Sequence, residues 1–134
     1  MLTTTTRASD RTRRYALLAA AALCAAVLGY HVLSTGEVMD PVYAAALPTE
    51  AKGILDVLWY DMALLIALGG LGMIAAAYNP RWRVPLAWFV GGHYLALSAI
   101  CLVFSFSWFG EAWSLIHWAV FAPMSLVTIW AAKS

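Results

Sequence analysis

Residues 57 to 78 read VLWYDMALLIALGGLGMIAAAY, and this stretch decides the fold. As an α-helix rising about 1.5 Å per residue, it extends about 33 Å, enough to cross the hydrocarbon core of a bilayer. One acid, Asp61, lies a single turn inside its first end. Because a carboxylate in hydrocarbon costs at least about 2.5 kcal/mol, Asp61 is expected to face a bundle interior or water, or to have a partner.

Three more stretches are equally apolar, and the composition of the whole chain is that of a membrane protein. The chain has 134 residues, of which 63% are hydrophobic and 11% charged, against roughly 25% charged in soluble domains. The sequence therefore predicts an all-α membrane protein, a four-transmembrane-helix bundle that forms a single domain over residues 15–132. The predicted spans are 15–33, 57–78, 84–106 and 112–132, and Pro123 is expected to kink the last of them.

The segments between the spans are also interpretable. Residues 1–14 are polar and basic without an apolar period, so we expect a disordered cytoplasmic tail. Residues 15–33 could be a signal peptide, but no small-x-small cleavage site follows them, so we expect a retained span. The outer loop, 34–56, is predicted to hold a short helix, 41–47, started by Asp40 and Pro41. Thr49 is expected to start a helix that continues into the second span.

The cations are segregated along the chain, which predicts orientation. Four spans place both termini and the 79–83 turn on one side, and only Lys52 on the other. Cytoplasmic segments are enriched in Lys and Arg, so both termini are expected in the cytoplasm and the protein in the cell inner membrane. The seven cations of that side are Arg7, Arg11, Arg13, Arg14, Arg81, Arg83 and Lys133.

Small residues four apart predict close helix packing in lipid. Such rows occur on the first three spans: Ala21, Ala25 and Gly29; Gly72 and Ala76; and either Ala87 with Gly91 or Gly92 with Ala96.

Depth along the helices suggests a polar pocket in the outer half of the bundle. His31, Asp61 and His117 all fall within about 7 Å of the outer ends of their spans. His93 lies deeper, near the midplane, and Glu111 shares a side of the fourth span with His117. The alternative is structural: Asp61 is hydrated, and each histidine is bonded to a backbone carbonyl or a serine.

Several functions fit these residues. An accessory or structural membrane component, as a homo-oligomer or within a larger membrane complex, needs nothing beyond the bundle and its lipid bilayer. Proton-coupled transport by a small oligomer, metal or haem binding, and acid-base catalysis on a lipid would each use the pocket. No close-spaced histidine pair identifies a cofactor. Nucleic acid is excluded as a partner, because no basic patch with exposed aromatics lies on a soluble domain.

Two further features carry a family resemblance. The second span opens with Trp59-Tyr60, and the fourth reads IHWAVFAPMSL from Ile116 to Leu126. Over roughly residues 49–132 the chain resembles small bacterial four-helix inner-membrane proteins of uncharacterised activity. The resemblance implies a fold and no particular chemistry.

Overall fold

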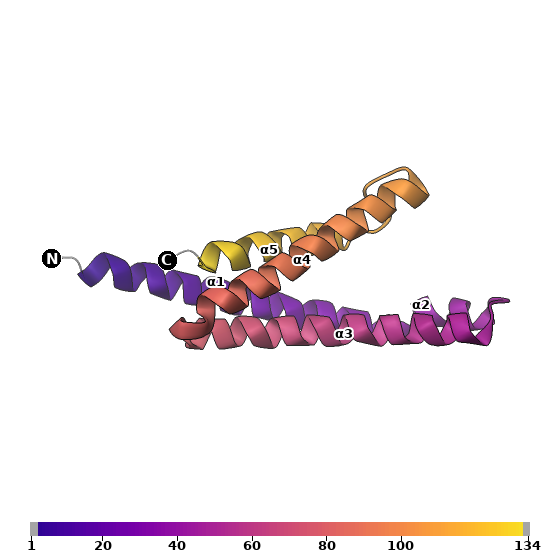
Figure 1. Ribbon diagram of the computed structural model, residues 1–134, viewed down its shortest axis with the longest axis horizontal. Helices are drawn as coiled ribbons and strands as arrows, with labels where there is room; N and C mark the ends of the chain where they lie inside the picture. The colour runs from indigo at the N-terminus through magenta and orange to yellow at the C-terminus, as the bar shows by residue number, and fades with distance from the viewer. Residues whose placement is uncertain (1–2, 133–134) are drawn as a thin grey trace. The chain divides into compact units, whose positions relative to one another are not determined.

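The computed structural model describes residues 3–132, with side chains from residue 10 onward (Figure 1). Its described residues form five α-helices and no strand: α1 (Thr3–Leu33), α2 (Thr35–Ala44), α3 (Thr49–Tyr78), α4 (Pro80–Phe109) and α5 (Trp118–Ala132). The predicted all-α class is confirmed. Three segments are long and apolar enough to cross a membrane, Asp10–Ala44, Thr49–Tyr78 and Pro80–Phe109, and α5 is a shorter apolar helix.

The helix in the fourth predicted span begins later than residue 112, because residues 110–117 form bends and turns. Gly110 ends α4 in the left-handed conformation (φ 73°). A residue with a Cβ atom is strained in this conformation. Ser105 then donates to the Glu111 carbonyl (2.7 Å) and accepts from the Leu115 amide (3.2 Å). These bonds replace helical ones, so α5 has 15 residues and extends about 22 Å.

The basic tail also differs from the prediction. Residues 3–14 are helical and continuous with the first apolar stretch, instead of disordered. Two contacts explain the order of the second half of this segment. Asp10 forms an ion pair with Arg83, and the guanidinium of Arg14 lies over the ring of Tyr78, 4.2 Å from its centroid.

The predicted outer loop, 34–56, is mostly helical. The predicted 41–47 helix instead spans Thr35–Ala44 and contains Pro41 in its interior. It follows α1 almost directly, since the Ser34 amide still bonds to the Tyr30 carbonyl (2.9 Å). The prediction that a helix starts at Thr49 and runs through Gly53 into the second span is confirmed.

The turn between α3 and α4 is tighter than predicted. Asn79 caps α4, its side chain accepting from the Arg81 amide (3.2 Å), and Pro80 occupies the first helical position. Arg81 and Arg83 therefore belong to the first turn of α4 instead of a loop.

The chain divides into two compact units, which are described separately: unit 1 is Met1–Ala20 with Gly72–Ser134, and unit 2 is Ala21–Leu71. In unit 1, α4 and α5 run side by side in opposite directions (Figure 1). The beginning of α1, the α3–α4 turn and the end of α5 lie at the same end of this unit. The predicted single domain over residues 15–132 stays a prediction.

The seam between α4 and α5 is closely packed. Tyr94 is fully buried and stacks on Phe121, with ring centroids 5.4 Å apart. Gly91 allows the closest approach, because a Cβ there would lie 2.6 Å from Cγ1 of Ile129. Of the two rows predicted for the third span, Ala87 with Gly91 is buried, whereas Gly92 with Ala96 is exposed.

The other small-residue rows are partly confirmed. In unit 1, Ala76 is fully buried, and a Cβ on Gly72 would lie 3.0 Å from Val90. In unit 2, Ala21 is buried, whereas Ala25 and Gly29 are exposed. The close approach there uses a residue outside the predicted row: a Cβ on Gly70 would lie 3.3 Å from Cβ of Cys24.

Candidate functional site

The five residues of the predicted pocket are divided between the two units. His31 and Asp61 belong to unit 2, and His93, Glu111 and His117 belong to unit 1. Each group is therefore described within its own unit, and convergence of all five stays a prediction.

His31 is held by a tryptophan of α3. Its ring stacks on Trp59 with centroids 3.8 Å apart, and its Nε2 lies 3.0 Å from the Trp59 carbonyl. Because a carbonyl oxygen only accepts, Nε2 carries the hydrogen. Trp59 in turn donates through Nε1 to Thr35 Oγ1 (3.0 Å), and Ser34 Oγ donates to the His31 carbonyl (3.2 Å). This arrangement joins the end of α1 to α3 and matches the structural alternative for His31.

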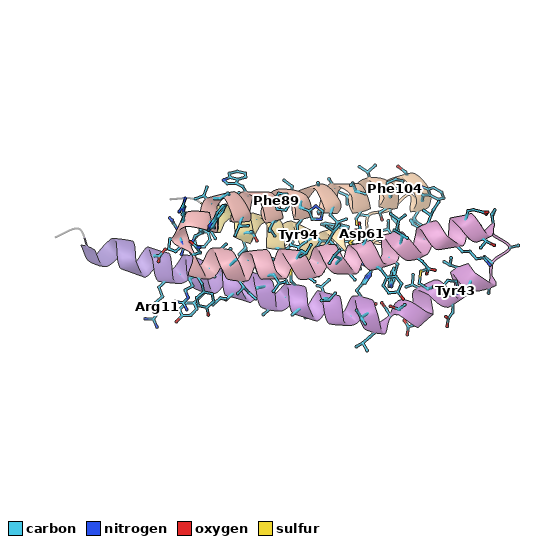
Figure 2. All side chains as sticks on the ribbon, turned by 60° about the horizontal axis from the view of Figure 1, so that its bottom comes forward. Arg11, Tyr43, Asp61, Phe89, Tyr94 and Phe104 are labelled. Atoms are coloured by element: carbon cyan, nitrogen blue, oxygen red, sulfur yellow. The ribbon has the colours of Figure 1, made fainter. Side chains whose placement is uncertain are left out.

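Asp61 lies on the exposed surface of α3. It lies near the middle of α3 and is labelled in Figure 2. Within the described residues of unit 2, no hydrogen bond or ion pair joins Asp61 to His31, whose Nε2 is directed to Trp59. The role of Asp61 as a proton-carrying or ligand-binding group stays a prediction.

His93 is half-buried in α4, next to Tyr94. Its Nε2 is enclosed and has no hydrogen-bond partner among the residues whose side chains the structure describes. An imidazole nitrogen without a partner is unusual in an interior. His93 is therefore the member of the predicted pocket whose polar atom the rest of unit 1 leaves unsatisfied.

Glu111 and His117 lie in the turns before α5, so the helical spacing used to align them does not apply. Glu111 nevertheless contacts Ser114, whose Oγ donates to Oε1 at 2.7 Å. Both pocket residues are exposed, and the His117 carbonyl accepts from the amides of Val120 (3.1 Å) and Phe121 (3.0 Å). The backbone carbonyl of His117 therefore accepts the first hydrogen bonds of α5.

Polar side chains along the α4–α5 seam bond mainly to carbonyls of their own chain. Ser98 donates to the Trp118 carbonyl (3.1 Å) and Ser125 to the Gly91 carbonyl (2.7 Å). Thr128 is fully buried and lies 2.6 Å from the Met124 carbonyl and 3.4 Å from the sulfur of Met73. The bonds of Ser98 and Ser125 join α4 to α5, whereas the Met124 carbonyl belongs to the same helix as Thr128.

Arg83 has a structural role that the sequence did not predict, where it counted only as one of seven cations. It is 8% exposed, donates through Nε to the Ala76 carbonyl (3.2 Å) and pairs through Nη1 with Asp10. One side chain thus joins α1, α3 and α4. The sequence did contain a signal for this ion pair. Asp10 is the only acidic residue in the segments that hold the seven cations assigned to that side.

A second polar cluster joins α2 to the start of α3 in unit 2. Tyr43 donates its hydroxyl to Asp56, and Lys52 donates to the Tyr43 carbonyl at 2.6 Å. The hydrogen bond to Asp56 raises the pKa of Tyr43 from 10.0 to about 12. Tyr43 follows the first predicted span, 15–33, and Lys52 and Asp56 precede the second, 57–78, so the cluster lies between these two predicted spans. It fixes α2 against α3.

Asp56→Asn is expected to return the pKa of Tyr43 toward 10.0. With Asp56 in place, the folded pKa of about 12 is above the ordinary value, so this bond stabilises the fold below pH 10 and is lost as the pH rises to 12. The pKa of Tyr43 is measured from tyrosinate absorbance in a pH titration. Subtracting the titration curve of Tyr43→Phe leaves the contribution of Tyr43 alone. Tyr30→Phe, at an exposed ring, is the control, and an identical Tyr43 titration in Asp56→Asn would contradict the assignment.

No cluster of three or more His, Cys, Asp or Glu side chains with metal-binding geometry occurs in the part of the chain that the structure describes. Metal, haem, transport and acid-base chemistry stay predictions. Fold and site together define an all-helical chain with three segments able to cross a membrane and a shorter apolar helix. No protein-family model, curated protein or solved structure matches this chain.

Proposed function

We propose that this protein is a structural or accessory component of a bacterial inner-membrane assembly, with four crossings and both termini in the cytoplasm. The observation that carries the proposal is the α4–α5 seam, in which Ser98 of α4 donates to the Trp118 carbonyl of α5 and Ser125 of α5 donates to the Gly91 carbonyl of α4. Groups that move protons or bind a substrate need access to water or ligand. These hydroxyls instead stabilise helix contacts, which supports a structural role.

Residues 110–132 are proposed to make the fourth crossing although α5 alone is short. Irregular backbone is tolerated near a membrane only where its polar groups are satisfied. Ser105 satisfies Glu111 and Leu115, and Trp118 Nε1 donates to the Ala112 carbonyl at 2.8 Å. The end of α5 lies at the same end of unit 1 as the α3–α4 turn (Figure 1), which supports an even number of crossings.

The orientation in this proposal rests on charge. Seven cations fall on the side of the termini and of the α3–α4 turn, and one falls on the other. A Lys and Arg bias of this kind favours the cytoplasm. The proposed location in a bacterial inner membrane is based only on the resemblance to small bacterial proteins.

The exterior of α4 supports association with another membrane protein. Phe89, labelled on α4 in Figure 2, is 76% exposed, and Ile100 and Val103 are 53% and 61% exposed. Between them lie Gly92 and Ala96, which are also exposed, and a Cβ on Gly92 meets nothing within 4 Å. A small pair inside a bulky apolar surface permits close approach of a further helix. This surface of α4 is the proposed site of association.

Gly92→Leu is expected to leave the chain folded but to reduce the recovery of its partner severalfold, because the leucine blocks close helix approach. The measurement is the composition and stoichiometry of complexes extracted in native-membrane nanodiscs, with a photo-crosslinker at position 89 to identify the neighbour. Gly53→Leu, at an open position outside the proposed spans, is the matched control. A parent protein recovered as a monomer, or a partner retained equally by Gly92→Leu, would contradict the proposal.

A further inference from the structure

Arginines gather at the end of unit 1 where α1 meets the α3–α4 turn. The Asp10–Arg83 pair and the Arg14–Tyr78 contact place residues 10–14 against residues 78–83. Arg11, Arg14 and Arg81 are exposed, and Arg13 is half-buried. In Figure 2, Arg11 extends away from the ribbon of α1. We call Arg11, Arg13, Arg14 and Arg81 the arginine collar.

The collar has a charge that the described part of unit 1 does not neutralise. The acidic residue at this end of unit 1 is Asp10, which forms an ion pair with the buried Arg83. Glu111, the other acid of the unit, lies beyond the far end of α4. Within the described residues, no carboxylate forms an ion pair with a collar arginine. Four guanidinium groups therefore remain available to an anion from outside the chain.

Aromatic rings orient two of these groups. Arg11 donates through Nε (3.3 Å) and Nη2 (3.2 Å) to the hydroxyl of Tyr15. Arg14 lies over the ring of Tyr78 at 4.2 Å. The rings of Tyr15, Tyr78 and Trp82 are themselves 55%, 60% and 53% exposed. Tyr and Trp rings favour the headgroup level of a bilayer, and a guanidinium forms paired hydrogen bonds with a phosphate.

We propose that the arginine collar binds the phosphates of anionic phospholipid headgroups in the cytoplasmic leaflet. Charge complementarity carries the proposal: uncompensated guanidinium groups lie beside exposed rings at the polar end of long apolar helices. Basic pockets between helices on the cytoplasmic side bind anionic headgroups in this way. The inference rests on the proposed function for its membrane orientation and adds a specific lipid partner. Bound lipid would join α1 to the α3–α4 turn from outside, as Arg83 does from inside.

The test uses the full chain in nanodiscs of phosphatidylcholine and phosphatidylglycerol. Spin-labelled forms of each lipid measure which one is immobilised at the protein surface. The parent is expected to retain phosphatidylglycerol preferentially, and Arg11→Gln, Arg14→Gln and Arg81→Gln combined to lower that preference about tenfold, since each cation near the surface contributes substantially. The matched control is Lys52→Gln, which removes the one cation of the other side and is expected to keep the preference.

Two further variants distinguish a loss of lipid binding from a loss of folding. Replacing the same three arginines with lysine keeps the charge and is expected to keep most of the preference. Arg81→Gln alone removes an exposed side chain whose contact to Asn79 uses only the backbone, so it is expected to fold as the parent does and to lose part of the preference. A preference unchanged in both glutamine variants would overturn the proposal.

The remaining outcomes separate this inference from the proposed function. A C-terminal reporter establishes whether the collar is cytoplasmic in cells. A correctly inserted parent that immobilises both lipids equally overturns lipid binding alone, and a parent that fails to insert overturns both proposals. Inorganic phosphate that abolishes the preference at constant ionic strength would show a site for free phosphate, which also overturns lipid binding.

Discussion

Gly91→Leu is expected to lower the free energy of unfolding by about 3 kcal/mol, as overpacking of a close helix contact does. The added Cβ would lie 2.6 Å from Cγ1 of Ile129 and 3.3 Å from the Ser125 carbonyl. One of these neighbours is backbone, so α5 must move away from α4. That movement also breaks the bond from Ser125 Oγ to the Gly91 carbonyl. Unfolding in mixed micelles, followed by circular dichroism and tryptophan fluorescence, measures the loss.

Gly92→Leu is the matched control, since it gains the same helix propensity over glycine at a position with nothing within 4 Å. It is expected to change the unfolding free energy by less than about 0.5 kcal/mol or to raise it slightly. Ile129→Ala removes the nearest atoms and should partly rescue Gly91→Ala in a double-mutant cycle. Equal stabilities of Gly91→Leu and Gly92→Leu would refute the described α4–α5 contact.

Arg83→Met is expected to destabilise unit 1 by about 2 kcal/mol, the range for a buried hydrogen bond to a charged group. Methionine keeps the apolar stem, so the loss reports the bonds to the Ala76 carbonyl and Asp10. The Asp10 side chain is 58% exposed, so its share of the effect is reduced by solvent screening. Hydrogen exchange should show faster opening of residues 10–20 of α1, which Arg83 joins to α3 and α4.

Arg81→Met provides the comparison, because Arg81 carries the same charge two residues away and is exposed. It is expected to change stability by less than about 0.5 kcal/mol. Asp10→Asn should destabilise the protein less than Arg83→Met, since the exposed carboxylate is screened by solvent and the bond from Arg83 Nε to the Ala76 carbonyl remains. If Arg83→Met and Arg81→Met were equally stable, the buried position of Arg83 would be wrong.

The sequence predicts a depth for each candidate residue but not the direction in which its side chain points. Counting residues from the ends of a helix placed His31 and Asp61 near the outer end of the predicted bundle. Which way each side chain points depends on the angle of its helix about its own axis. The structure turns His31 onto Trp59 and leaves Asp61 exposed. Spans that are apolar all round carry little amphipathic pattern from which that angle could be inferred.

The fourth helix shows the same limit in another form. Residues 112–132 are apolar enough to predict a continuous span. Ser105 bonds to Glu111 and Leu115 across the end of α4, and Trp118 bonds to Ala112. Bonds of this kind depend on the return of the chain along α4, so hydropathy alone could not locate the start of α5.

The sequence by itself determined that the chain is helical, that its apolar helices are long enough to cross a membrane, and that its cations are concentrated in a few short segments. These properties depend on residue composition over short windows, and each helix satisfies its own backbone. Only the tertiary structure decided that Gly91 and not Gly92 is packed, and that Arg83 is buried against Asp10 and Ala76. Such contacts join residues far apart in the chain, and they depend on helix rotation and crossing that neighbouring residues do not specify.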